Sequence, residues 1–113
     1  MLKVKRVYEA PSAEDDFQIL VDRLWPRGLT REKVDLWLKE IAPSNVLRKW
    51  FAHNEARWSE FKQEYFGELS NKREAIDIIL LRMTEGDVTL LFGAQNEKLN
   101  NAVALREYLE KRR

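Results

Sequence analysis

The sequence predicts an α/β fold: a small three-layer domain with a short, mostly parallel sheet flanked by about five helices. Two nearly continuous apolar runs predict the sheet. They occupy residues 17–21 and 88–92 and are rich in β-branched and aromatic side chains, as strands covered on both faces are. Apolar residues at helical spacing predict the helices, which fall between and after these runs.

The expected strands differ in how buried they should be. A first strand at residues 2–8 alternates apolar and basic residues, which is typical of a half-exposed strand. The runs 17–21 and 88–92 should be central strands. The connection from residue 9 to residue 16 is short for a parallel crossover, so the sequence leaves the pairing of the first two strands open.

Five helices are expected from capping signals and apolar stripes. The signals that begin them are Thr30, Pro43 with Ser44, Asn54, Asn71 with Glu74, and Asn100, and Gly86 ends the fourth helix. The stripes that these helices should bury are Val34, Trp37, Leu38 and Ile41; Leu47, Trp50 and Phe51; Trp58, Phe61, Tyr65 and Leu69; Ile76, Ile79, Leu80 and Met83; and Ala102, Leu105, Tyr108 and Leu109.

Composition excludes several classes of protein. The 113 residues fit one domain, residues 1–113, and the 44% apolar content is that of a folded chain. With a net charge of +1, no overall field attracts nucleic acid or an anionic membrane. The absence of cysteine excludes disulfides and thiolate sites, and a single histidine argues against structural zinc. No segment has the length of a membrane span or signal peptide, so we expect a cytoplasmic protein.

The first candidate segment runs from Val21 to Gly28, where a buried strand leads into Asp22, Arg23, Trp25 and Arg27. Ligands of open α/β sheets bind beyond the carboxyl ends of the strands. Two guanidinium groups there would suit a phosphate or carboxylate, with Asp22 orienting one of them and Trp25 offering a stacking face. The alternative is structural: an ion pair from Asp22 to either arginine fixes the turn, and Trp25 is core.

The second candidate segment follows the last strand, from Phe92 to Asn101. The amino terminus of a helix offers free backbone N–H groups to an anion, and the amides of Asn96, Asn100 and Asn101 suit the polar edge of a ligand. The same residues are also ordinary helix caps and loop formers. If both segments end neighbouring strands at one edge of the sheet, their loops share a crevice.

Histidine and tryptophan leave two further alternatives. Histidine is the residue type that suits a general acid or base near neutral pH, so His53 is a candidate for that role, but it is equally suited to the carboxyl end of a helix, which we favour. Trp37, Trp50 and Trp58 fall on apolar helical faces and should be core. For Trp25, the sequence leaves both a stacking role and a core role open. Phosphate loops, nucleophile elbows and paired-histidine metal motifs are absent from the sequence, and no cofactor is implied.

The sequence resembles the YeaO-like family of uncharacterised bacterial proteins, a branch of domain of unknown function 488. The resemblance covers nearly the whole chain and lies in residues 5–8, 21–28, 38–44, 47–51, 57–61 and 89–109. It implies an α/β fold and a cytosolic bacterial setting, without an established activity. The wider family has a polar loop after the last strand that often contains cysteine or histidine. Here that loop reads Leu99-Asn100-Asn101, which makes thiol or imidazole chemistry there doubtful.

Three functions remain, and whether the chain is an enzyme stays open. The first is a site for a phosphorylated or otherwise anionic small molecule, built from Asp22, Arg23, Trp25, Arg27, Asn96, Asn100 and Asn101. The second is a nucleic-acid-associated module that uses the same arginines, with Trp25 as a stacking platform. The third is a protein-interaction or regulatory domain in which the arginine turn is structural. The sequence favours them in that order.

Overall fold

The computed structural model describes residues 1–9 and 17–112. Its sheet has four strands in the order β1-β4-β2-β3, and every neighbouring pair is parallel. The strands are β1 (Leu2–Arg6), β2 (Phe17–Leu20), β3 (Leu36–Trp37) and β4 (Val88–Phe92). The two apolar runs therefore form the central strands, as the sequence predicts. The first two strands do not pair with each other, because β4 lies between them.

The two faces of the sheet bury different clusters of side chains. Ile19 pairs with Leu90 and Leu20 pairs with Leu91 in the register of β2 and β4. Because successive side chains of a strand point to opposite faces, the first pair belongs to the large core and the second to a smaller cluster. Both central strands are thus covered on both faces.

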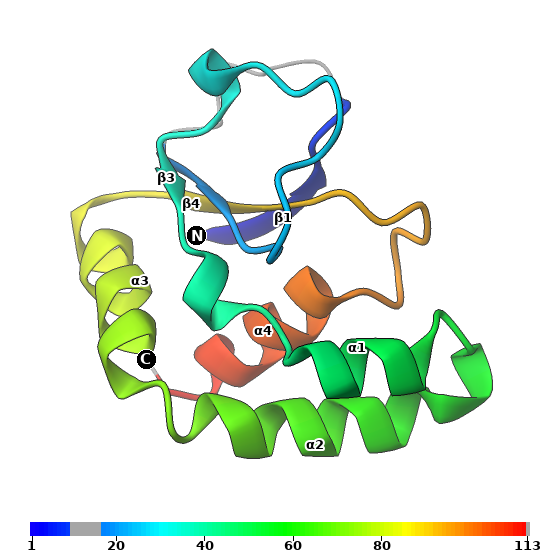
Figure 1. Ribbon diagram of the computed structural model, residues 1–113. Helices are drawn as coiled ribbons and strands as arrows, with labels where there is room; N and C mark the ends of the chain where they lie inside the picture. Colours follow the sequence, from blue (N-terminus) through cyan, green and yellow to red (C-terminus); the bar gives the residue numbers. More distant parts are fainter. Residues whose placement is uncertain (10–16, 113) are drawn as a thin grey trace.

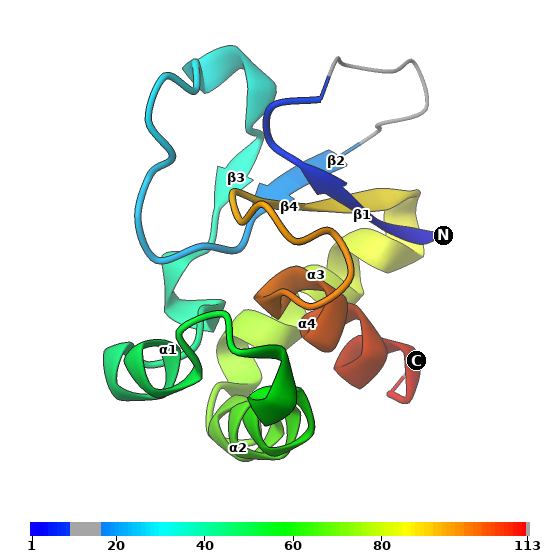
Figure 2. The same ribbon diagram turned by 90° about the vertical axis from the view of Figure 1, so that its right-hand side faces the viewer.

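All four α-helices of the described residues lie on the same face of the sheet (Figures 1 and 2). They are α1 (Asn45–Phe51), α2 (Trp58–Leu69), α3 (Arg73–Glu85) and α4 (Asn101–Glu110). Short 3-10 turns, η1 (Arg31–Lys33), η2 (Lys39–Ile41) and η3 (Glu55–Arg57), lie in the connections. The smaller cluster contains Leu29 with Trp25, Val34 and Trp37 packed against it, so a loop that includes η1 makes the third layer.

The helix expected after Thr30 is wrong. The structure has the turn η1 there, followed by the edge strand β3, in which Leu36 and Trp37 pair with Ile19 and Leu20. The side chain of Asp35 accepts a hydrogen bond from the backbone N–H of Gln18, at 2.8 Å, next to the start of this pairing. Hydrogen bonds along the open edge of β2 therefore outweigh a helical periodicity that spans only two turns.

The predicted helix ends at Ser44, Gly86 and Asn100 are confirmed, whereas Asn54 and Asn71 do not cap the helices predicted to follow them. Ser44 and Asn100 cap α1 and α4 with their side chains, and Gly86 follows the last residue of α3. Asn54 caps η3, which leads directly into α2. Asn71 is not a cap, because α3 begins after Lys72 and no side chain caps it. The carbonyl oxygen of Lys72 instead accepts the first bond of the helix, from the backbone N–H of Ile76.

Trp50 is not a core residue, contrary to the prediction from its spacing on α1. Its side chain is exposed, whereas Leu47 and Phe51 on the same helix are buried. The helix has only seven residues and packs on α2 along a narrow stripe, so Trp50 falls beside the contact. The guanidinium of Arg57 lies over the indole ring, 5.1 Å from its centroid. Trp37 and Trp58 are partly buried against the two clusters.

Candidate functional site

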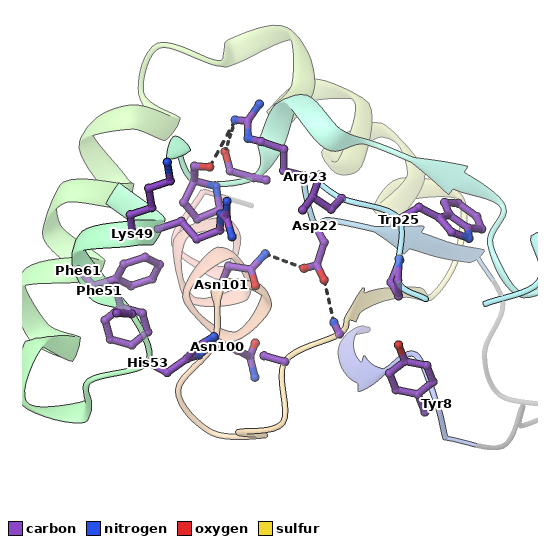
Figure 3. Close-up of a pocket in the computed structure, with 18 residues that line it drawn as sticks. Tyr8, Asp22, Arg23, Trp25, Lys49, Phe51, His53, Phe61, Asn100 and Asn101 are labelled. Atoms are coloured by element: carbon purple, nitrogen blue, oxygen red, sulfur yellow. Dashed lines mark hydrogen bonds between the residues drawn. The ribbon is translucent and has the colours of Figure 1, made fainter. Parts of the chain in front are cut away.

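A cavity of about 580 Å³ opens where the carboxyl ends of three strands meet (Figure 3). Tyr8 follows β1, the segment from Asp22 to Pro26 follows β2, and Gly93 follows β4, and all of them line the cavity. Because these strands are parallel neighbours, their ends lie at one edge of the sheet. The last turn of α1 and the first residues of α4 close the other sides. The two candidate segments therefore share one crevice.

Asp22 connects two of the loops that line this cavity. Its Oδ2 atom accepts a hydrogen bond from the backbone N–H of Gly93 at 2.8 Å, and its Oδ1 atom accepts one from Nδ2 of Asn101 at 3.2 Å (Figure 3). Burial raises the pKa of Asp22 above its ordinary value, while these two bonds partly oppose the rise. The carboxylate thus ties β2 to β4 and to α4.

Gly93 lets the backbone approach this carboxylate closely. A Cβ atom at this position would lie 3.2 Å from Oδ2 of Asp22, closer than an unstrained contact, and it would also touch the ring of Pro26. The absence of a side chain at the end of β4 is therefore what permits the bond between Gly93 and Asp22.

Arg23 is held by backbone carbonyl groups and not by a carboxylate. Its Nη2 atom lies 3.5 Å from the carbonyl oxygen of Ala42 and 3.3 Å from that of Pro43 (Figure 3). Its Nε atom is buried and has no hydrogen-bond partner in the part of the chain that the structure describes. The predicted alternative of an ion pair from Asp22 to Arg23 or Arg27 is wrong, because neither ion pair forms within residues 1–9 and 17–112.

Lys72 is a second cation that binds the segment of Ala42 and Pro43. Nζ of Lys72 donates to the carbonyl oxygen of Ala42 at 2.7 Å. Burial lowers the pKa of Lys72; the charge of Glu68 opposes this shift and that of Arg23 adds to it. Two positive groups therefore meet at one carbonyl oxygen beside the cavity, and the carboxylate of Glu68 is near enough to stabilise the charge of Lys72.

The end of α1 adds cations that sequence reasoning missed. Arg48 and Lys49 line the cavity, and both side chains are exposed to solvent. Ala52 and His53 follow them with φ angles of 45° and 58°, in the left-handed region, and these two residues also line the cavity. His53 thus lies just beyond the carboxyl end of a helix, as the sequence indicates, and faces the candidate site (Figure 3).

Of the three predicted asparagines, two line the cavity and one shapes a nearby loop. Asn100 and Asn101 line the cavity, and Asn96 does not. The side chain of Asn96 accepts bonds from the backbone N–H groups of Lys98 and Leu99, and its carbonyl oxygen accepts one from Nδ2 of Asn100. Asn96 therefore shapes the loop that leads into α4.

Trp25 lines the cavity, and Arg27 does not. The indole of Trp25 lines the cavity but is partly buried, donates from Nε1 to the carbonyl oxygen of Leu29 at 2.9 Å, and packs edge-on against Trp37. Arg27 has an exposed side chain that is not part of the cavity wall, and its carbonyl oxygen accepts a bond from the hydroxyl of Tyr8. The structure therefore brings together Asp22, Arg23, Trp25, Asn100 and Asn101, and leaves Arg27 and Asn96 outside.

Two core phenylalanines also form part of the cavity wall, and both are buried, as their spacing predicts. Phe51 and Phe61 line it, with stacked rings whose centroids are 4.4 Å apart. The sequence indicated that the phenylalanines are core residues and gave no sign that they line a cavity. For the cations of α1 there was a sequence signal, because Arg48 and Lys49 directly precede the segment with His53. In the described ranges, no three metal-ligating side chains come together, and no helix is long and apolar enough to cross a membrane.

Comparison with known proteins identifies relatives along the whole chain. The chain is 36% identical to the uncharacterized protein YeaO of Escherichia coli K12 over 110 residues, which cover 96% of each chain. It is 41% identical over 70 residues to uncharacterized protein Mb3100c of Mycobacterium bovis and to Rv3073c of Mycobacterium tuberculosis, covering 60% of this chain and 59% of each relative. No solved structure matches it. Residues 1–113 match the family described as the inactive DUF488-N3 subclade, and the chain therefore belongs to this family, as its resemblance to YeaO-like proteins indicated.

Proposed function

We propose that this protein binds a phosphorylated or otherwise anionic small molecule in the cavity at the carboxyl ends of its strands. The observation that carries the proposal is the imbalance of charge in the cavity wall. Arg23, Arg48 and Lys49 line it, and Asp22 is the one carboxylate among the described residues that do so. None of the three cations forms an ion pair within the described ranges.

Burial of Asp22 increases this imbalance. Because its pKa is raised, its negative charge is less favourable than that of an exposed aspartate, and both of its oxygens already accept hydrogen bonds. An anion in the cavity would meet guanidinium and ammonium groups whose donors have no carboxylate acceptor, which is the arrangement that phosphate recognition uses.

The dimensions and the apolar wall favour a small molecule over a polymer. About 580 Å³ lies within the ordinary range for small-molecule sites, and apolar residues such as Pro43 and Ala94 line it alongside the buried rings of Phe51 and Phe61. The nucleic-acid alternative needs Trp25 as a free stacking platform, but its indole is fixed by Leu29 and Trp37. We therefore place nucleic acid second.

We further propose that the site binds its ligand without chemical turnover. The family is described as inactive, which supports this reading. Asp22 is engaged in two structural hydrogen bonds and Asn100 caps α4, so the polar groups at the centre of the site already have structural roles. The remaining groups, Arg48, Lys49 and His53, suit recognition of negative charge.

Isothermal titration with propyl phosphate tests the proposal. The variant Arg48→Ala/Lys49→Ala removes two exposed cations of the cavity wall, and we expect its affinity to fall at least about tenfold, equivalent to about 1.4 kcal/mol. The matched control is Arg27→Ala/Arg31→Ala, which removes two exposed arginines that do not line this cavity and should bind like the wild type.

Two results would overturn the proposal. One is the absence of binding to the folded wild type by both propyl phosphate and glycerol 3-phosphate. The other is an equal loss of affinity in the cavity variant and in the control, because nonspecific attraction by surface charge would then explain the binding. Binding of short oligonucleotides that is tighter than that of the small phosphates and falls steeply with salt would favour the nucleic-acid alternative instead.

A further inference from the structure

We infer that the ligand also carries a hydroxyl group, which Asn101 recognises; this inference rests on the proposed function and names the class of its ligand. Asn101 lies at the start of α4 and lines the cavity between Asp22 and the end of α1 (Figure 3). Its amide presents an unused hydrogen-bond acceptor, whereas the cations nearby present donors. A phosphorylated polyol, sugar or nucleoside has both matching groups.

The orientation of the Asn101 amide is fixed by its partners. Its Nδ2 atom donates to the carbonyl oxygen of Val21 at 3.0 Å and to Oδ1 of Asp22 at 3.2 Å. Both partners are oxygen acceptors, so a flipped amide would place oxygen against oxygen. The Oδ1 atom of Asn101 therefore faces away from them and can only accept.

This oxygen has no hydrogen-bond partner in the described part of the chain. It is also absent from the fully buried atoms that lack a partner, which are Nε of Arg23 and Oγ1 of Thr89, so it remains accessible. Because Asn101 lines the cavity, a molecule inside the cavity can reach it. A ligand without a donor would cover this oxygen and leave it unpaired.

Other polar groups of the wall are already engaged. Asn100 accepts a bond from the backbone N–H of Val103 and donates to the carbonyl oxygen of Asn96. The hydroxyl of Tyr8 and the indole N–H of Trp25 donate to backbone carbonyl oxygens. Among the side-chain amides of the wall, Asn101 is therefore the one whose oxygen is unused in the described residues, and an oxygen of this kind accepts from a donor.

A hydroxyl suits this position better than an amine. Arg23, Arg48 and Lys49 share the cavity wall and would repel an ammonium group. A hydroxyl is a neutral donor and is not repelled. The cations would hold the phosphate group, and Asn101 would distinguish a hydroxylated carbon framework from an apolar one.

Titration of the wild type with glycerol 3-phosphate and propyl phosphate tests the inference. The two probes have the same charge and the same three-carbon chain, and they differ in two hydroxyl groups. We expect glycerol 3-phosphate to bind at least about fivefold more tightly. In Asn101→Leu, which removes the acceptor, we expect this preference to disappear while propyl phosphate still binds.

Each outcome has one meaning. Equal affinity of the wild type for the two probes overturns the inference and leaves anion binding intact, whereas failure of both probes to bind overturns the proposed function itself. A folded Asn101→Leu protein that keeps the preference shows that another residue reads the hydroxyls. If that variant does not fold, the comparison of the two probes on the wild type still decides whether hydroxyls are recognised.

Discussion

The side chain of Asp22 connects the ends of β2, β4 and α4, although burial disfavours its negative charge. The carboxylate receives N–H groups from Gly93 and Asn101, yet its burial outweighs these bonds and raises its pKa. Sequence reasoning placed Asp22 and Asn101 at one site because parallel strands end at one edge. It could not find the bond between them, since which polar side chains meet depends on the positions of the backbone.

The raised pKa of Asp22 predicts a pH dependence of stability. The folded state holds the proton of this carboxyl more tightly than the unfolded chain, whose pKa is near the ordinary 3.8. The stability from this group is therefore full below pH 3.8 and is lost as the pH rises through the folded pKa. Urea unfolding of wild type and Asp22→Asn from about pH 3.5 to 7 should show the wild type losing stability relative to the variant. A difference that stays constant over this range would contradict the raised pKa.

Ala52 carries backbone strain beside the cavity, and its removal should stabilise the fold. Its φ of 45° ends α1 in a left-handed conformation that glycine adopts without cost. We expect Ala52→Gly to raise the free energy of unfolding by about 0.5–1 kcal/mol, measured by urea denaturation.

The control for Ala52 is the same substitution in a right-handed turn. Ala56 lies in η3, and its φ is not positive. Ala56→Gly should therefore lower stability, because glycine loses more conformational freedom there. If both substitutions destabilise the protein to the same extent, Ala52 is not strained.

At the scale of elements, the sequence predicted those with a clear apolar pattern and failed on the shortest strand, β3. The stripe from Trp58 to Leu69 forms α2, and Val88–Phe92 is a fully buried strand. β3 has two residues, and its existence depends on the free edge of β2 rather than on its own sequence. Its indole also has a tertiary role, since Nε1 of Trp37 donates to the carbonyl oxygen of Asp22.

Tyr65 on α2 fixes the connection that carries the carbonyl groups bound by Arg23. Its hydroxyl is buried and donates to the carbonyl oxygen of Ile41 at 2.6 Å, and burial raises its pKa well above the ordinary value, so it stays a donor. Tyr65→Phe should lower the free energy of unfolding by about 1–2 kcal/mol, because the carbonyl oxygen loses this partner. Tyr108→Phe is the control: its ring is also buried, but within residues 1–9 and 17–112 its hydroxyl forms no hydrogen bond. Equal losses in the two variants would show that the bond to Ile41 does not account for the effect.

At the scale of the whole molecule, the parallel sheet brings separate parts of the chain to one cavity. The order of strands could not be predicted, because the sequence does not reveal that β4 inserts between β1 and β2. The class was predictable, since runs such as Val88–Phe92 are apolar on both faces. The asymmetry of the two layers around the sheet was not predictable. The sequence predicted a helix after Thr30, whereas a loop that includes η1 covers the face of the sheet with the smaller cluster.

This arrangement predicts a gradient of local stability across the sheet. β4 has a strand on each side and is buried throughout, whereas β3 pairs through two residues and has β2 as its one neighbour in the sheet of the described residues. Backbone N–H groups of β4 that bond to its neighbours should exchange with solvent only on global unfolding, and those of β3 and η1 should exchange faster, through local opening. Native-state hydrogen exchange followed by NMR measures both. If β3 were protected as strongly as β4, the loop layer over the smaller cluster would unfold together with the core, and the cavity wall that begins at Asp22 would be part of the same cooperative unit.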